Sequence, residues 1–94
     1  VKYIVFRCVG YDGMVIEIPI IFPKMLVHRH VAGQLSSVLR NQHNFKEVKV
    51  VSAGEASIHY FSCSGESGML EVSARPQDRY LIDKYQIHNG LVKE

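Results

Sequence analysis

Two histidines, His28 and His30, stand two residues apart in the stretch HRHVAGQLSSVLRN. Imidazole nitrogens are common zinc ligands, and a strand would point both rings to one face, as a shared metal site requires. On an α-helix, residues two apart lie about 200° from each other around the axis, which is too far to share a metal ion. Because this stretch has a helical pattern, we interpret both histidines as capping or surface residues and predict no metal here.

His59 and Cys63 share one face of a strand pattern, four residues apart. Their Cα atoms would be ~13 Å apart at the normal strand rise, too far for one zinc ion without a bulge. Cys8 could add a ligand only through a strand pairing that the sequence does not specify. Both cysteines alternate with large apolar residues, as buried and unreactive thiols do. We favour free thiols in a reducing compartment, with a single disulfide as the alternative, and we predict no cofactor.

The loop SCSGESG, residues 62–68, is rich in serine and glycine. Loops that bind phosphate lead into the N-terminus of a helix, where backbone N–H groups converge. This loop leads into a strand instead, and Glu66 would repel phosphate. Its composition is typical of a hairpin loop. Since no acid–base pair, metal cluster or phosphate loop is present, we expect no catalytic residues and no enzyme activity.

Basic and aromatic residues could bind nucleic acid by pairing with phosphates and stacking on bases. The candidates are Lys2, Tyr3, Arg7, Lys46, Lys49 and Tyr60. The net charge is only +2 and the isoelectric point is about 8.6, whereas dedicated nucleic-acid binders more often exceed ~9 and cluster their basic residues. Lys46 and Lys49, three apart, do not share a strand face. Nucleic-acid binding therefore stands as the alternative function.

One amphipathic helix organises the chain and is predicted over residues 28–41. Its apolar face recurs at helical spacing and comprises Val27, Val31, Leu35, Val38 and Leu39. The start is less defined, because Pro23 could occupy the first turn or His28 could cap a helix that begins near residue 29. Gly33 costs roughly 1 kcal/mol against alanine inside a helix, so we expect it to allow close approach to a sheet.

Five strands are predicted, over residues 2–9, 14–22, 45–52, 56–63 and 69–74. The first strand is apolar on both faces, which predicts a central strand covered on both sides. The pair Asp12–Gly13 predicts a hairpin to the second strand. Pro19 cannot donate to a strand ladder, so the second strand should lie at an edge or bulge there. Turns are expected at residues 53–55 and 64–68, and a second helix should open at residues 75–78 and end near residues 88–90.

These elements predict a single α+β, β-rich domain over residues 1–94, in the order ββαβββα. The sheet is expected to be antiparallel and strongly bent, or closed into a small Sm-like barrel with one main helix. The alternative is an open antiparallel sheet with two helices on one face. With 94 residues and an apolar fraction of 47%, the chain can build one core but no large enzyme of the doubly wound or barrel kind.

The strand order is similar to that of a circularly permuted Sm-like barrel, although the Sm sequence signatures are missing and no RNA-binding role is carried over. Phe22–Pro23 before a short helix, VVSAG at residues 50–54 and a small terminal helix resemble small uncharacterised proteins of tailed phages and of marine environmental sequence. That resemblance implies no activity.

The second strand carries an unusually long apolar row. We predict that part of it is an interface between copies, formed through β-edge contacts by Ile16, Ile18, Ile20 and Met69. The alternative is that a curled sheet buries this row internally. The expected function is thus a non-catalytic assembly or interaction module, such as a phage accessory or structural protein. The longest apolar run, residues 14–25, is interrupted by Glu17, prolines and Lys24, so we expect no membrane contact and a cytoplasmic protein.

Overall fold

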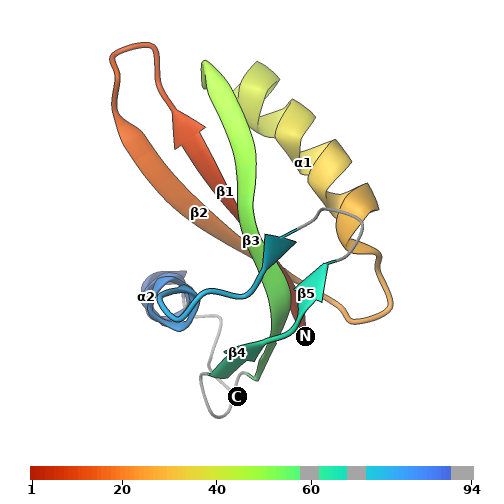
Figure 1. Ribbon diagram of the computed structural model, residues 1–94. Coiled ribbons are helices and arrows are strands. Elements are labelled where there is room, and N and C mark those ends of the chain that lie inside the picture. The colour runs from red at the N-terminus through yellow and green to blue at the C-terminus, as the bar shows by residue number, and fades with distance from the viewer. Residues whose placement is uncertain (58–61, 68–71, 90–94) are drawn as a thin grey trace.

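The computed structural model describes residues 1–57, 62–67 and 72–89. The elements in chain order are β1 (Lys2–Val9), β2 (Val15–Phe22), α1 (His28–Gln42), β3 (Glu47–Ser57), β4 (Ser62–Ser64), β5 (Glu66–Ser67), β6 (Val72–Ser73) and α2 (Asp78–Asn89). This is the expected α+β class (Figure 1). Neither helix, as far as the described residues go, is long and apolar enough to cross a membrane.

The main sheet has the strand order β2-β1-β3-β4, and all its pairs are antiparallel. β5 and β6 form a separate antiparallel pair. Among the described residues no pairing joins β2 to β4, so the sheet is open and does not close into a barrel. The open form of the two expected sheets is therefore the one observed.

β1 lies in the middle of the sheet and is covered on both sides, as its two apolar faces predict. Tyr3, Ile4, Val5 and Phe6 are all completely buried. Successive side chains of a strand point to opposite faces, so Ile4 and Phe6 belong to one face and Tyr3 and Val5 to the other. Each pair anchors a separate hydrophobic cluster.

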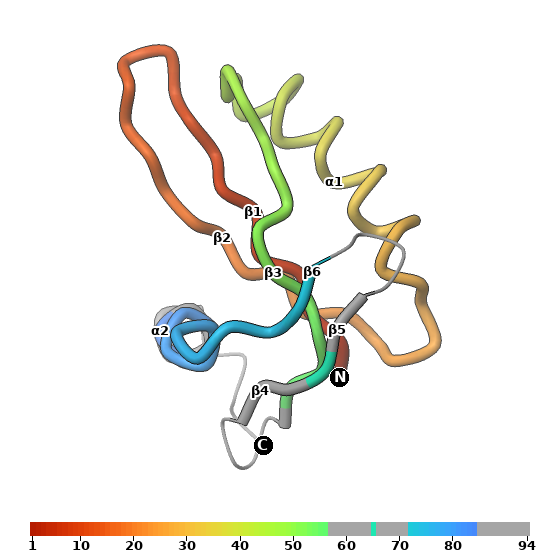
Figure 2. Tube along the Cα trace, in the orientation of Figure 1, coloured from red at the N-terminus to blue at the C-terminus, as the bar shows by residue number. Residues whose placement is uncertain are grey.

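The two helices cover opposite faces of the sheet, and the expectation that both lie on one face is wrong. Ala32 and Leu39 of α1 pack in the cluster of Ile4 and Phe6, whereas Ile82 of α2 packs with Tyr3 and Val5. Figures 1 and 2 show α1 on one side of the sheet and α2 on the other. Because both faces of β1 are apolar, each needs its own cover.

β3 runs through the predicted turn at residues 53–55, so that prediction is wrong. Its register against β1 shifts between Val5 and Phe6, which marks a bulge that keeps one long strand paired. Gly54 is buried inside the strand, where the start of α1 approaches its carbonyl. A strand glycine can mark such a close contact rather than a turn.

The chain after β3 differs from the prediction in its boundaries. The predicted strand over residues 56–63 begins inside β3, and residues 58–61 lie outside the described part. The predicted loop at residues 64–68 contains β5, which pairs with β6. Of the predicted strand over residues 69–74, the structure describes β6 and residue 74, and residues 69–71 lie outside the described part.

The hairpin between β1 and β2 forms as Asp12–Gly13 predicts. The N–H of Gly13 donates to Gly10 O at 3.0 Å, and the N–H of Gly10 donates to Met14 O at 2.8 Å. Gly13 has φ +87°, a left-handed conformation that glycine adopts at low cost. β2 is an edge strand, as predicted, and Pro19 therefore lies at a position where a residue without an N–H donor is tolerated.

α1 begins at His28, with Val27 at the N-cap position and no side-chain cap. The predicted start at residue 28 is confirmed, whereas a helix with Pro23 in its first turn and a helix capped by His28 are both wrong. Residues 23–26 form a turn outside the helix, in which Leu26 N–H donates to Pro23 O at 3.1 Å. Gly33 is exposed, and a Cβ atom added there would meet nothing within 4 Å, so it does not serve close packing on the sheet.

Candidate functional site

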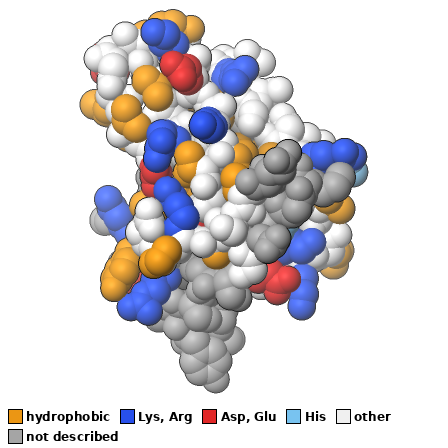
Figure 3. Space-filling model, viewed as in Figure 1, with side chains coloured by type: hydrophobic (Ala, Val, Ile, Leu, Met, Phe, Trp, Pro, Cys, Tyr) orange, Lys and Arg blue, Asp and Glu red, His pale blue; other side chains and the backbone are white. Residues whose placement is uncertain are grey.

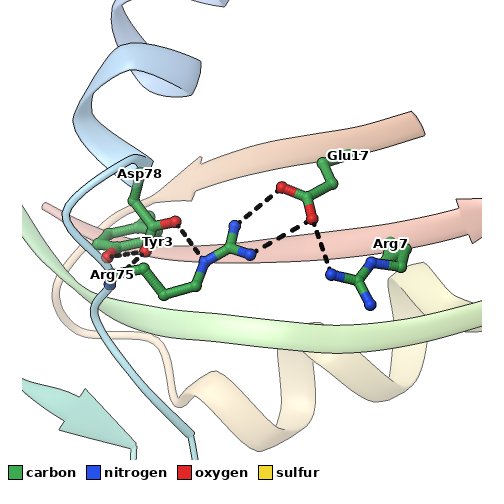
Figure 4. A network of polar contacts seen from close by, with 5 residues as sticks. All are labelled: Tyr3, Arg7, Glu17, Arg75 and Asp78. Carbon is green, nitrogen blue, oxygen red and sulfur yellow. Dashed lines mark hydrogen bonds and ion pairs between the residues drawn. The ribbon is translucent and has the colours of Figure 1, made fainter. Parts of the chain in front are cut away.

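A polar network connects the start of α2 to β1 and β2 (Figure 4). The Tyr3 hydroxyl donates to Asp78 Oδ2 at 2.7 Å, and both residues are completely buried. Asp78 Oδ2 also accepts the backbone N–H of Arg75 at 2.8 Å, and Asp78 Oδ1 accepts Arg75 Nε at 2.9 Å. Asp78 is the first residue of α2, and its bonds to Arg75 close the turn that precedes the helix. Together with the bond from Tyr3, they fix the start of α2 to the sheet.

The two terminal nitrogens of the Arg75 guanidinium bind Glu17. They donate to Glu17 Oε1 at 2.9 Å and to Oε2 at 3.3 Å, and Arg7 donates to Oε2 at 3.2 Å. The Arg75 hydrogen bond is the main cause of a lowered Glu17 pKa, with Arg7 contributing. In turn, the Glu17 hydrogen bond raises the pKa of Arg75. A bidentate arginine–carboxylate pair of this kind gives directional, charge-assisted contacts.

The geometry of this network indicates a role in stability rather than in binding or catalysis. The charged atoms of Arg75, Glu17 and Asp78 face each other, and Asp78 is closed off from solvent. From the sequence, Asp78 is predicted only as part of a helix opening, and its pairing with Tyr3 is not foreseen. The signal that could have found it is RPQD at residues 75–78, in which proline stands in the turn before the helix and an acid begins the helix.

The histidines do not form a common site in the described structure. His28 is buried, its Nε2 lies 3.1 Å from Gly54 O, and its ring stands edge-on to Phe22 with centroids 5.4 Å apart. His28 thus fastens the start of α1 to β3 and β2. His30 is exposed, and His59 lies outside the described residues. Within the described chain, no three histidine, cysteine or acidic side chains come together as metal ligands.

Cys8 is a free, buried thiol, and burial raises its pKa. A raised pKa keeps the thiol protonated at neutral pH, and the protonated form is not nucleophilic. The side chain of Cys63 lies outside the described part, so the structure gives no pairing for it.

Among the residues considered for nucleic-acid binding, the fold brings Arg7 and Lys49 together and buries Tyr3. Tyr3 is buried and Tyr60 is outside the described residues. Lys2 Nζ donates to Leu26 O at 2.9 Å. Arg7 and Lys49 stand directly opposite each other on β1 and β3, on the α2 side of the sheet, and both are exposed. Figure 3 shows basic side chains along this side, with acidic atoms between them.

An apolar row runs along β2 on the α1 side of the sheet. It consists of Met14, Ile16, Ile18 and Ile20, which we term the β2 strip. The isoleucines pack against the α1-side core but are only half-buried, and Met14 is 62% exposed. α1 packs chiefly over β3 and β1, which leaves the edge strand partly uncovered. Met69, the fourth residue expected at an interface, lies outside the described residues.

A cleft of about 360 Å³ opens at the hairpin end of the β2 strip. Its lining comes from the hairpin loop and from the turn between α1 and β3, and comprises Gly10, Tyr11, Asp12, Met14, Ile16, His43, Asn44 and Phe45. The two segments are about thirty residues apart in the sequence, and the cleft exists because β1 brings the hairpin beside the start of β3. Ile16 is an interface candidate from the sequence, but the cleft is visible only in the fold.

No protein-family model matches the chain, and no curated protein or solved structure is a match. We therefore infer the function from the surfaces of the chain itself.

Proposed function

We propose that the chain is a non-catalytic assembly module that self-associates through the β2 strip. One observation carries this proposal. Ile16, Ile18 and Ile20 lie on the core face of the sheet yet remain partly exposed, whereas their β1 neighbours on the same face are completely buried. An apolar row left open on an edge strand, extended by the exposed Met14, is a surface suited to another protein chain.

The contact is expected through side chains on the face of β2 rather than through a new strand ladder. The N–H of Gly10 donates to Met14 O, and hydrogen-bonded pairs alternate along an antiparallel ladder. The backbone N–H and C=O groups of the even-numbered β2 residues therefore bond to β1, whereas those of the odd-numbered residues point toward the free edge. Pro19 is one of the outward residues and has no N–H to offer. It therefore interrupts the free edge at its centre, as edge strands that resist pairing commonly do.

The setting that we propose follows from the sequence resemblance and from Cys8. An accessory or structural role in a phage particle would need self-association of this kind, and the resemblance to small phage proteins supports it. The free thiol of Cys8 supports a cytoplasmic site of synthesis, since unpaired thiols persist in reducing compartments.

Nucleic-acid binding is the second candidate, and one observation favours it. Arg7 and Lys49 are like charges directly opposite each other, an arrangement that destabilises a sheet unless an anion compensates. Glu17 pairs with Arg7, but no described acidic group forms an ion pair with Lys49. A polyanion could supply the missing charge. Salt-sensitive binding of a labelled single strand, weakened by Lys49→Gln, would support this function, and no binding at low salt would reject it.

Sedimentation velocity over a concentration series tests the assembly function. Wild-type protein should sediment above the 10.7 kDa of one chain, and Met14→Asp should shift it toward that mass. Val15→Asp is the matched control, because Val15 is exposed, adjacent in sequence and on the other face of β2. Wild-type protein at the single-chain mass throughout would overturn the proposal, as would equal effects of the two substitutions.

A further inference from the structure

The cleft at the hairpin end and the loop at the opposite end of β2 are complementary in chemistry. We infer that a second copy of the chain binds head-to-tail, with its loop of residues 23–27 seated in the cleft beside the β2 strip. This inference rests on the proposed self-association and names the two surfaces that meet. We refer to residues 23–27 as the Met25 loop.

The Met25 loop is an exposed apolar projection. Met25 is 85% exposed, more than any other large hydrophobic residue described, and Leu26 and Val27 are each 44% exposed. The loop is nevertheless held in place, since Leu26 N–H donates to Pro23 O and Lys2 Nζ donates to Leu26 O. A segment already fixed in one conformation loses less entropy on binding than a flexible one.

The cleft offers what a methionine side chain binds well. Tyr11 and Met14 are largely exposed at its rim, and Ile16 and Phe45 are half-buried within it. Its volume of about 360 Å³ leaves room for the Met25 side chain and part of a neighbouring residue. Methionine is unbranched and adaptable, and its sulfur makes favourable contacts with aromatic rings such as those of Tyr11 and Phe45.

The positions of the two surfaces require a second copy. β2 starts next to the hairpin and ends at Phe22, directly before the Met25 loop, so the two surfaces are separated by about the 27 Å length of an eight-residue strand. Figure 1 shows the hairpin and the β2–α1 connection at opposite ends of the sheet. One copy therefore cannot fill its own cleft. A contact between different surfaces is heterologous and generates a ring or an open filament.

Charge complements the apolar contact. Asp12 lines the cleft, whereas the Met25 loop carries Lys24 and is followed by Arg29 in the first turn of α1. All three residues are exposed. Opposite charges at the rims of two such surfaces orient the partners and speed their encounter.

A mixing experiment tests the head-to-tail contact directly. Met25→Asp removes the projection but keeps the cleft, and Met14→Asp damages the cleft but keeps the projection. Both residues are exposed, so circular dichroism should show each variant folded. Each variant alone should sediment as a single chain, while an equimolar mixture should form a 1:1 complex of twice that mass, because one intact cleft meets one intact loop. Tyr80→Asp, exposed on α2 away from both surfaces, should assemble like the wild type.

The outcomes separate this inference from the proposed function. A mixture that stays at the single-chain mass, or a Met25→Asp variant that assembles like the wild type, would overturn the head-to-tail contact while wild-type self-association still stands. A wild-type protein that is itself a single chain would instead remove the proposed function, and with it the contact.

Discussion

At the scale of single residues, the strongest polar contacts stabilise the packing of α2. The hydrogen bond between Tyr3 and Asp78 joins residues that are 75 apart in the sequence, and Arg75 binds the same carboxyl group. Asp78 receives hydrogen bonds from a hydroxyl, a backbone N–H and a guanidinium, so its burial is compensated. The surface that we propose for self-association lies elsewhere, in residues whose apolar side chains are left partly uncovered.

Replacement of Tyr3 by phenylalanine should lower the free energy of unfolding, because the buried carboxylate of Asp78 loses one of its hydrogen-bond donors. The ring remains, but Asp78 loses its hydroxyl donor. We expect the free energy of unfolding to fall by about 1.5–3 kcal/mol, the usual range for a hydrogen bond to a charged group. Urea unfolding measures this. Tyr80→Phe is the control, since that hydroxyl is exposed and its loss should stay within about 0.5 kcal/mol. Equal effects would contradict the role of Asp78.

Glu17 should make stability depend on pH in the acidic range. The pKa of Glu17 in the folded chain is lowered from 4.5, first by the Arg75 hydrogen bond. Glu17 therefore binds a proton more readily in the unfolded chain than in the folded one. The stabilisation is therefore complete above pH 4.5 and is lost as the pH falls below that value through the folded pKa. Unfolding of wild type and Glu17→Gln at a series of pH values should show their stability difference shrinking on acidification. A constant difference would contradict this assignment.

At the scale of elements, the sequence predicts best where the signal is local. The bounds of β1, the hairpin at Asp12–Gly13 and the edge position of Pro19 all follow from short patterns of polarity and turn residues. The turn predicted at Gly54 is wrong because a glycine beside an acidic residue has the same pattern in a turn and in a strand that another element approaches closely. Which face each helix covers depends on strand pairing between distant segments, which periodicity does not encode.

Gly33 and Gly13 should respond in opposite directions to replacement by alanine. Gly33 lies exposed in α1 with open space around its Cα, so Gly33→Ala should raise the free energy of unfolding by up to about 1 kcal/mol. Gly13→Ala should lower it by about 1–2 kcal/mol, because φ +87° is strained for any residue with a Cβ atom. Thermal and urea unfolding of both variants measure these changes. Destabilisation by Gly33→Ala would show that the helix tolerates no side chain there.

At the scale of the whole molecule, an open sheet with one helix on each face leaves its edge strand only partly covered. The candidate interface isoleucines could be read from the sequence because Ile16, Ile18 and Ile20 alternate on a strand. The cleft could not, since its walls come from the hairpin loop and the α1–β3 turn. The Met25 loop likewise becomes apparent only in the fold, where its exposure marks it as a projection.

The central claim is that copies of this chain associate through apolar surfaces. Light scattering across a size-exclusion peak, at low and at high salt, measures the mass in solution most directly. We predict an oligomer mass well above 10.7 kDa that persists at both salt concentrations, because apolar contacts are not screened by ions. A mass of one chain under both conditions would contradict the claim.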